Sequence, residues 1–263
     1  MNYKFTNQVL LALRTNNPNL AKHTYEMAEL LPETQTAVRL KMQSDIIVDG
    51  SLYGDNNQFI QICFNKGIPS VLKTVSPKEY SGMKTLEDAN VQHPHIISWT
   101  LPPKDASSKP NKCFVVMPLM PVTMENLYGI PRDMAEKLFI QIGSALTYLH
   151  TKQFVHMDVK PSNICIDSYG NFILIDLGSC CGIGYDSAST AGYYPTDWEP
   201  NPARPETDWW MLSVTVFDKL NDVGKGVTID ERDHKSCAQL LDWFSAHHPS
   251  LFTLVCDKTK VGK

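Results

Sequence analysis

The stretch FVHMDVKPSNICID, residues 154–167, sets polar side chains between two apolar ends. The polar residues that stand out are His156, Asp158, Lys160 and Asn163. Pro161 lies among them, and a proline inside a helix removes a hydrogen bond and clashes with the preceding turn. It is also confined to the edges of sheets, because it cannot donate to a strand ladder. The pattern therefore predicts a loop whose charged residues need a reason other than packing.

The bulk composition is that of a globular protein with a sizeable core. The chain has 263 residues, which suits one large domain or two small lobes. Hydrophobic residues make up 43% and charged residues 20%, so wholesale disorder is not expected. The formal net charge is −4, whereas dedicated nucleic-acid binders are usually basic. We therefore expect no dedicated nucleic-acid binding.

Cysteine usage and the N-terminal sequence point to an intracellular protein. The seven cysteines include no C-x-x-C pair, and their odd number favours free thiols in a reducing compartment. The apolar run at residues 9–13 is too short for a signal peptide core or a membrane span. We expect a location in the cytoplasm or nucleus and no membrane partner.

The hydrophobic patterning divides the chain into three parts. Residues 1–44 show helical spacing and predict an N-terminal helical extension that braces the next part, docks a partner or forms a regulatory helix pair. Residues 45–118 are rich in β-strand patterns, and residues 119–263 are mainly helical. The expected strands are 45–48, 58–64, 70–75, 96–101, 112–117 and 171–176. The expected helices are 79–92, 133–151 and 208–220. Turn signals at Asp49-Gly50 and near residues 54–57 and 65–67 separate the first three strands.

Two motifs in fixed order give the chain a family resemblance. His156-x-Asp158-x-Lys160-x-x-Asn163 follows a helix, and Asp176-Leu177-Gly178 ends the strand expected over 171–176. This resembles the H-R-D-x-x-x-x-N catalytic loop, here residues 154–167, and the D-F-G motif of eukaryotic-type protein kinases. Met157 replaces the arginine of the loop, and Leu177 replaces the phenylalanine. The resemblance covers about residues 45–220.

The resemblance implies an α+β, bilobal, protein-kinase-like fold. Residues 45–118 would form a small antiparallel β-sheet lobe with one helix. Residues 119–263 would form a mainly helical and shortened second lobe. The apolar residues Leu240, Leu241, Trp243 and Phe244 could form one remaining packing helix near its end.

The resemblance also implies the chemistry of the site. The reaction would be transfer of the γ-phosphate of ATP, with Mg²⁺ or Mn²⁺, to serine or threonine hydroxyls of a protein substrate. Asp158 would accept or orient the hydroxyl proton, and Lys160 would lie near the transferred phosphate. Asn163 and Asp176 would hold the metal through oxygen atoms. Asx turns could account for one or two of these residues, but they do not account for the whole set in register.

Nucleotide-binding residues are expected in the β-rich part. Lys73, on the strand over 70–75, resembles the lysine that pairs with the α- and β-phosphates. In the loop expected over the phosphates, residues 49–55, only Gly54 of the three family glycines is kept. Gly50, Ser51 and Tyr53 are the other loop residues that we expect near the nucleotide. Met117 aligns with the residue beside the adenine, and the backbone N–H of Met120 is the expected adenine donor because Pro118 has none.

The family pairs its strand lysine with a glutamate from the next helix. Counting back from His93-Pro94 without gaps puts Lys84 at the glutamate position. Glu87 lies one turn further along, so we expect Glu87 to pair with Lys73. Glu79 is the poorer choice, and a plain surface role for Glu87 is the alternative.

The activation segment is expected over residues 176–199. Thr190 and Tyr193 fit the family pattern, whereas the A-P-E triplet appears as Pro195-Thr196-Asp197. Because Met157 cannot bind a phosphate as an arginine can, we expect activity without phosphorylation of Ser189, Thr190 or Thr196. Asp208 resembles the buried aspartate that braces the catalytic loop.

Three functions fit the sequence, and we favour the first. An active serine/threonine protein kinase explains why all five expected phosphate, base and metal residues are present. A pseudokinase-type nucleotide-binding scaffold that regulates a partner would explain the altered glycine loop and the shortened second lobe. A kinase-like enzyme acting on a small molecule is the third reading. The compact form also resembles kinases from viruses or compact genomes, in which case the location would be a host cell.

Overall fold

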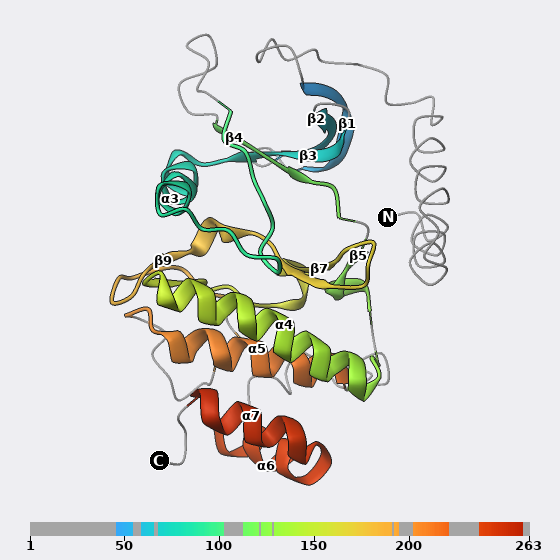
Figure 1. The fold of residues 1–263 in the computed structure, drawn as a ribbon, viewed down its shortest axis with the longest axis vertical. Helices are drawn as coiled ribbons and strands as arrows, with labels where there is room; N and C mark the ends of the chain where they lie inside the picture. Colours follow the sequence, from blue (N-terminus) through green and yellow to red (C-terminus); the bar gives the residue numbers. More distant parts are fainter. Residues whose placement is uncertain are drawn as a thin grey trace. The chain divides into compact units, whose positions relative to one another are not determined.

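The computed structural model describes residues 46–54, 59–65, 68–102, 113–120, 122–127, 129–190, 192–194, 202–220 and 237–259, which Figure 1 shows as coloured ribbon. The helical extension expected over 1–44 lies outside these residues. The chain divides into two compact units. The first takes in the described residues up to Gln92, together with 97–122 and 167–170, and the second takes in 93–96, 123–166 and those from Asn171 on.

The first unit contains a four-stranded antiparallel sheet in the order β1-β2-β3-β4. Its strands are β1 (Ile46–Gly54), β2 (Phe59–Asn65), β3 (Ile68–Val75) and β4 (Cys113–Pro118). The turn predicted at Asp49-Gly50 is wrong, because β1 runs through it to Gly54. The register shifts between Val48 and Gly50, so the extra residue forms an irregularity inside the ladder.

One helix, α3 (Pro77–Asp88), completes the first unit. It buries Met83 and Leu86, and Met83 joins a core cluster with Val75, Cys113 and Val115. The helix begins two residues before, and ends four residues before, the bounds predicted for it. The strand predicted over 96–101 is wrong: only single bridges form there, Ile96 with Leu174 and Thr100 with Val116. Pro94 and Pro102 bracket this segment and limit a continuous ladder.

The second unit is mainly helical. Its helices are α4 (Arg132–Thr151), α5 (Pro205–Leu220), α6 (Cys237–His247) and α7 (Pro249–Thr259). The packing helix predicted around Leu240 and Phe244 is confirmed as α6, and the structure adds a second helix near the C-terminus, α7, that the sequence did not predict. Pro249 opens the second of them, and a proline at the first helical position is well tolerated there but not in a helix interior. No helix of the described residues is long and apolar enough to span a bilayer.

Short strands frame the polar loop. A three-stranded sheet has the order β5-β7-β8 and a two-stranded sheet pairs β6 with β9. These strands are β5 (Val122–Thr123), β6 (Phe154–Val155), β7 (Ile164–Ile166), β8 (Phe172–Leu174) and β9 (Cys181–Gly182). Single 3-10 turns lie at η1 (Met124–Asn126), η2 (Pro161–Asn163) and η3 (Leu177–Ser179). The loop therefore runs from β6 to β7, and its flanks are fixed by hydrogen-bonded pairs.

Helices α4 and α5 lie side by side, and a glycine allows their close approach (Figure 1). A Cβ atom at Gly143 would lie 2.8 Å from Cη2 and 2.9 Å from Cζ3 of Trp209, whose side chain is buried. We expect Gly143→Val to lower the free energy of unfolding by about 2–3 kcal/mol, because it overpacks this contact. Urea denaturation would measure the loss.

Gly82→Val is the matched control for this change. Gly82 also lies in a helix, but a Cβ atom there would meet nothing within 4 Å. Replacing a helical glycine that has such space should leave stability unchanged or raise it slightly. Equal losses in the two variants would contradict the packing argument.

Candidate active site

Asp208, in the first turn of α5, anchors the start of the polar loop. Its carboxylate is fully buried and accepts the backbone N–H groups of His156 and Met157, each at 2.8 Å. His150 Nε2 donates to the same carboxylate at 2.9 Å. Met157 has φ +67°, a conformation that non-glycine residues adopt at a cost. The buried carboxylate therefore holds the backbone of the loop in a strained shape, as expected for a residue that braces it.

The histidine of the motif ties the loop to the strand before Asp176. The His156 ring is fully buried, accepts the backbone N–H of Asp158 at Nδ1 (3.3 Å), and donates from Nε2 to the carbonyl of Ile175 (3.2 Å). This is the hydrogen-bond pattern of the Nε2–H tautomer. Thr215 Oγ1 donates to the Val159 carbonyl at 3.4 Å from helix α5. The loop backbone is thus fixed on both sides of Asp158.

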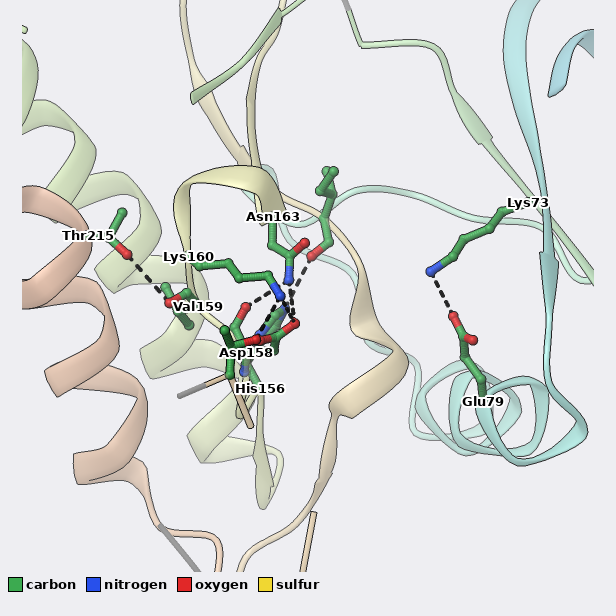
Figure 2. Close-up of polar contacts among 10 residues, drawn as sticks. Lys73, Glu79, His156, Asp158, Val159, Lys160, Asn163 and Thr215 are labelled. Carbon is green, nitrogen blue, oxygen red and sulfur yellow. Dashed lines mark hydrogen bonds and ion pairs between the residues drawn. The ribbon is translucent and has the colours of Figure 1, made fainter. Parts of the chain in front are cut away.

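Polar groups converge on Asp158 (Figure 2). Lys160 Nζ forms an ion pair with Oδ2 at 2.9 Å, and Asn163 Nδ2 donates to Oδ2 at 2.8 Å and to the Asp158 carbonyl at 2.9 Å. The Thr190 hydroxyl donates to Oδ1 at 2.5 Å and accepts from Lys160 Nζ at 2.8 Å. The structure therefore brings together three residues that the motif predicted. The contact made by Thr190, 32 positions further on, has no local signal in the sequence beyond its place in the activation segment.

Asn163 and Asp176 present oxygen atoms that suit a divalent cation. Both donor contacts of Asn163 use Nδ2, which leaves the amide oxygen as the atom able to act as a ligand. Asp176 has φ +57° and precedes η3, and the adjacent Ile175 N–H donates to the Asn163 carbonyl at 2.9 Å. No three His, Cys, Asp or Glu side chains among the described residues gather to form a metal site. Mg²⁺ usually takes one or two protein carboxylates together with waters and substrate phosphates, so these residues fit that ion.

The partner of Lys73 is Glu79, so the pairing predicted with Glu87 is wrong. Lys73 Nζ lies 2.9 Å from Glu79 Oε1, and both side chains are only 12% exposed (Figure 2). Glu87 instead pairs with Lys84 at 2.7 Å on the exposed side of α3. The reason is the length of the connection: only Ser76 separates β3 from α3, so the first turn of the helix reaches Lys73.

Substitution of each glutamate in turn tests which of them is the functional partner of Lys73. For the ATP-dependent reaction that the family resemblance implies, we expect Glu79→Gln to lower kcat/KM for ATP about tenfold, because a neutral amide holds the lysine less firmly than a carboxylate does. Glu87→Gln makes the same change on the same helix and should leave kcat/KM unchanged. Steady-state kinetics with varied ATP would measure both. A larger loss of kcat/KM in Glu87→Gln than in Glu79→Gln would show that Glu79 is not the functional partner of Lys73.

The remaining residues expected near the nucleotide lie on two strands of the first unit. Gly50, Ser51, Tyr53 and Gly54 belong to β1 and pair with β2, and the structure describes only their backbone. Met117 pairs with Val71 near the end of β4 and packs against the first-unit core cluster. Met120 follows this strand. Their contacts with a nucleotide stay predictions.

Apolar packing occupies the position where the family carries an arginine. Met157 is fully buried and clusters with Val155, Ala203 and the partly buried Cys181. A cationic phosphate receptor is therefore not formed at this point of the loop.

The predicted free thiols are confirmed where the structure describes them. The free cysteines of the described part are Cys113, Cys165, Cys180, Cys181 and Cys256. Burial raises the pKa of Cys165 to about 12, so this thiol stays protonated at neutral pH. The side chains of Cys63 and Cys237 lie outside the described residues.

A β3 lysine paired with a helix glutamate, and a loop that gathers lysine and asparagine on one aspartate, are each features that protein kinases carry. The protein kinase domain matches residues 70–245, more than half of the chain, so the chain belongs to the protein kinase family. The match begins inside β3 and leaves the altered glycine loop of β1 outside.

The similar proteins are serine/threonine kinases at low identity. The chain is 25% identical over 166 residues to rat (Rattus norvegicus) serine/threonine-protein kinase Sgk2, which covers 58% of this chain and 44% of that protein. It is 35% identical over 99 residues to rat Sgk3, covering 35% and 20%. It is 25% identical over 167 residues to the cAMP-dependent protein kinase catalytic subunit of Schizosaccharomyces pombe, covering 57% and 32%. The matches span less than half the length of these relatives.

Proposed function

We propose that the protein is an active, ATP-dependent serine/threonine protein kinase. The observation that carries the proposal is the set of contacts on Asp158, where Lys160, Asn163 and a threonine hydroxyl all lie within 2.9 Å of its carboxylate. A carboxylate that accepts a hydrogen bond from a hydroxyl group, and that has an ammonium group beside it, is suited to take the proton of an acceptor hydroxyl. The serine/threonine kinases among its relatives support the choice of acceptor.

Each residue of the site has a role in this reaction. Asp158 orients the acceptor hydroxyl and takes its proton as the oxygen attacks the γ-phosphorus and the bond to ADP breaks. Lys160, which is paired with the Asp158 carboxylate, neutralises charge on the transferred phosphoryl group. Lys73, held by Glu79, pairs with the α- and β-phosphates. Asn163 and Asp176 would hold Mg²⁺ or Mn²⁺, which neutralises phosphate charge when bound.

Transfer of labelled phosphate from ATP tests the proposal directly. The native chain would be incubated with Mg²⁺ or Mn²⁺ and a mixed protein substrate, and phosphoserine and phosphothreonine would be separated from phosphotyrosine. In parallel, the melting temperature would be measured with and without ATP, since a ligand of the native state raises it. Label on serine or threonine supports the proposal, and label on tyrosine alone, or on none of the three residues, overturns it.

The second function is a nucleotide-binding scaffold of the pseudokinase type. The observation in its favour is the glycine loop: Asp49 and Ser51 replace two of the three family glycines, and β1 continues through this segment as a strand. A rise in melting temperature with ATP, without any transfer by the native chain, would support the scaffold. A partner protein would then be the regulated component.

Activity should not depend on phosphorylation of the activation segment. Met157 is buried among apolar residues, so a phosphate on this segment would gain no arginine partner at that point. We expect phosphatase-treated protein carrying Ser189→Ala and Thr196→Ala to keep kcat within about twofold of the untreated native chain. Thr190 is left intact, because its hydroxyl contacts Asp158 and Lys160 directly. A loss of turnover with unchanged ATP binding would refute the prediction.

A further inference from the structure

The corner between β3 and α3 is unusually short. β3 ends at Val75, Ser76 is the single connecting residue, and α3 begins at Pro77. Lys73 and Glu79 lie on the two sides of this corner, six positions apart, and form their 2.9 Å ion pair across it. The orientation of the pair therefore depends on how this one connection is held.

Ser76 holds the connection through the helix cap. Its side-chain oxygen accepts the backbone N–H of Glu79 at 3.1 Å, and its carbonyl accepts the N–H of Tyr80 at 2.9 Å. Its φ of −69° and ψ of 157° are the extended values favoured before a proline. The first N–H groups of a helix have no partner within the helix, so this cap fixes the first turn.

The helix cap acts on the same turn of α3 that carries Glu79, the ion-pair partner of Lys73. Glu79 belongs to the first helical turn, and its own N–H is the group that Ser76 caps. Further along α3, Met83 and Leu86 are buried in the core and hold the rest of the helix without the cap. Loss of the cap would therefore loosen the turn that carries Glu79 while most of the helix stays packed.

We propose that Ser76 is a positioning residue for the phosphate-binding Lys73, acting through the capped backbone and the carboxylate of Glu79. This inference rests on the proposed use of ATP. Because the connection is one residue long and is followed by a proline of fixed φ, the corner assembles the ion pair from local interactions. The protein then needs no partner to bring the helix glutamate to the lysine.

The test compares a cap deletion with a cap replacement. In Ser76→Ala the side-chain acceptor is lost, and we expect kcat/KM for ATP to fall about fivefold, with the KM for the protein substrate unchanged. In Ser76→Asn a neutral cap of similar strength is kept, and we expect kcat/KM to return to within about twofold of the native value. All assays are run well below the melting temperature, where every variant is folded.

Thr85→Gly is the matched structural control. Thr85 is exposed in the later part of α3, and glycine there weakens the helix without touching the first turn. It should lower the melting temperature about as much as Ser76→Ala does, yet leave kcat/KM for ATP at the native value. Equal kinetic losses in the two variants, or none in Ser76→Ala, would overturn the role of Ser76.

Two further measurements separate this inference from the proposed function. The dissociation constant of Mg-ATP, measured by calorimetry, needs no phosphate transfer, and we expect Ser76→Ala to raise it while Ser76→Asn does not. If the native chain binds ATP but transfers no phosphate, the enzymatic function fails and this comparison still decides the role of Ser76. If the native chain binds no ATP, both proposals fall. Amide hydrogen exchange at Glu79 should quicken in Ser76→Ala, and unchanged exchange would contradict the cap argument.

Discussion

Asp158→Asn is expected to lower kcat by about a thousandfold or more. The asparagine keeps the size of the side chain, but it cannot take the proton of the acceptor hydroxyl. Its ion pair with Lys160 at 2.9 Å is also lost. ATP should still raise the melting temperature of the variant, because the lysine that pairs with the α- and β-phosphates is unchanged. Labelled-phosphate transfer and thermal unfolding, measured on the same preparation, check the two statements.

Asp176→Asn should lower kcat by a similar factor for a different reason. A neutral amide is a weaker ligand for Mg²⁺ than a carboxylate, so this loss should shrink as the metal concentration rises. The loss in Asp158→Asn should not respond to metal. The difference between the two responses separates a proton acceptor from a metal ligand.

Asp133→Asn is the matched control for both variants. Asp133 is exposed in the first turn of α4 and contributes the same charge change away from the polar loop. Its kcat should stay within about twofold of the native value, since exposed charges contribute little. Native-like turnover in Asp158→Asn would rule out Asp158 as the base. A loss of the ATP-dependent rise in melting temperature would show that the substitution disturbed binding instead.

The sequence predicted the polar loop well because its chemistry is local. His156, Asp158, Lys160 and Asn163 lie within eight positions, and Pro161 forces the chain into a turn that gathers them. The long amphipathic helix before the loop was also predicted to within one residue at its start. In both cases short-range patterning and backbone stereochemistry decide the structure.

The pairing predicted for Glu87 is wrong because the connection between β3 and α3 is short. Counting back from His93 treats the helix as having the family's spacing, whereas the connection after β3 is a single residue. The sequence does carry the correcting signal: Ser76, then Pro77, then Glu79 three positions after the serine is the pattern of a helix start. This pattern places Glu79 in the first turn of the helix, next to the strand that carries the lysine.

Contacts between distant segments could not be predicted from pattern. Thr190 meets Asp158 only because the activation segment folds back on the loop, and Gly143 meets Trp209 only because α4 and α5 pack closely. Hydrophobic periodicity gives the buried face of a helix, but it does not give the partner of that face or the separation of the two axes. These contacts depend on tertiary packing, and neither residue spacing nor hydrophobic periodicity indicates which distant segments will meet.

Asp208→Asn is expected to lower the free energy of unfolding by about 3–4 kcal/mol. The native carboxylate is fully buried and accepts three hydrogen bonds, from the backbone of His156 and Met157 and from the ring of His150. Asparagine offers one oxygen and places an N–H₂ group against these donors. At least one buried donor therefore loses its acceptor. The remaining hydrogen bonds become weaker, because their acceptor no longer carries a negative charge.

We expect Asp208→Asn to disturb the catalytic loop as well as to lower the free energy of unfolding. Met157 keeps its positive φ only while the carboxylate holds its N–H, so the loop can relax in the variant and move Asp158 away from its partners. We expect kcat to fall at least about tenfold even at temperatures where the variant is folded. Asp133→Asn again provides the contrast, because it removes an exposed aspartate from the first turn of a helix and should lower stability by less than about 1 kcal/mol. Urea denaturation of both variants decides the matter: a loss in Asp208→Asn as small as that in Asp133→Asn would mean that the buried carboxylate does not hold the loop.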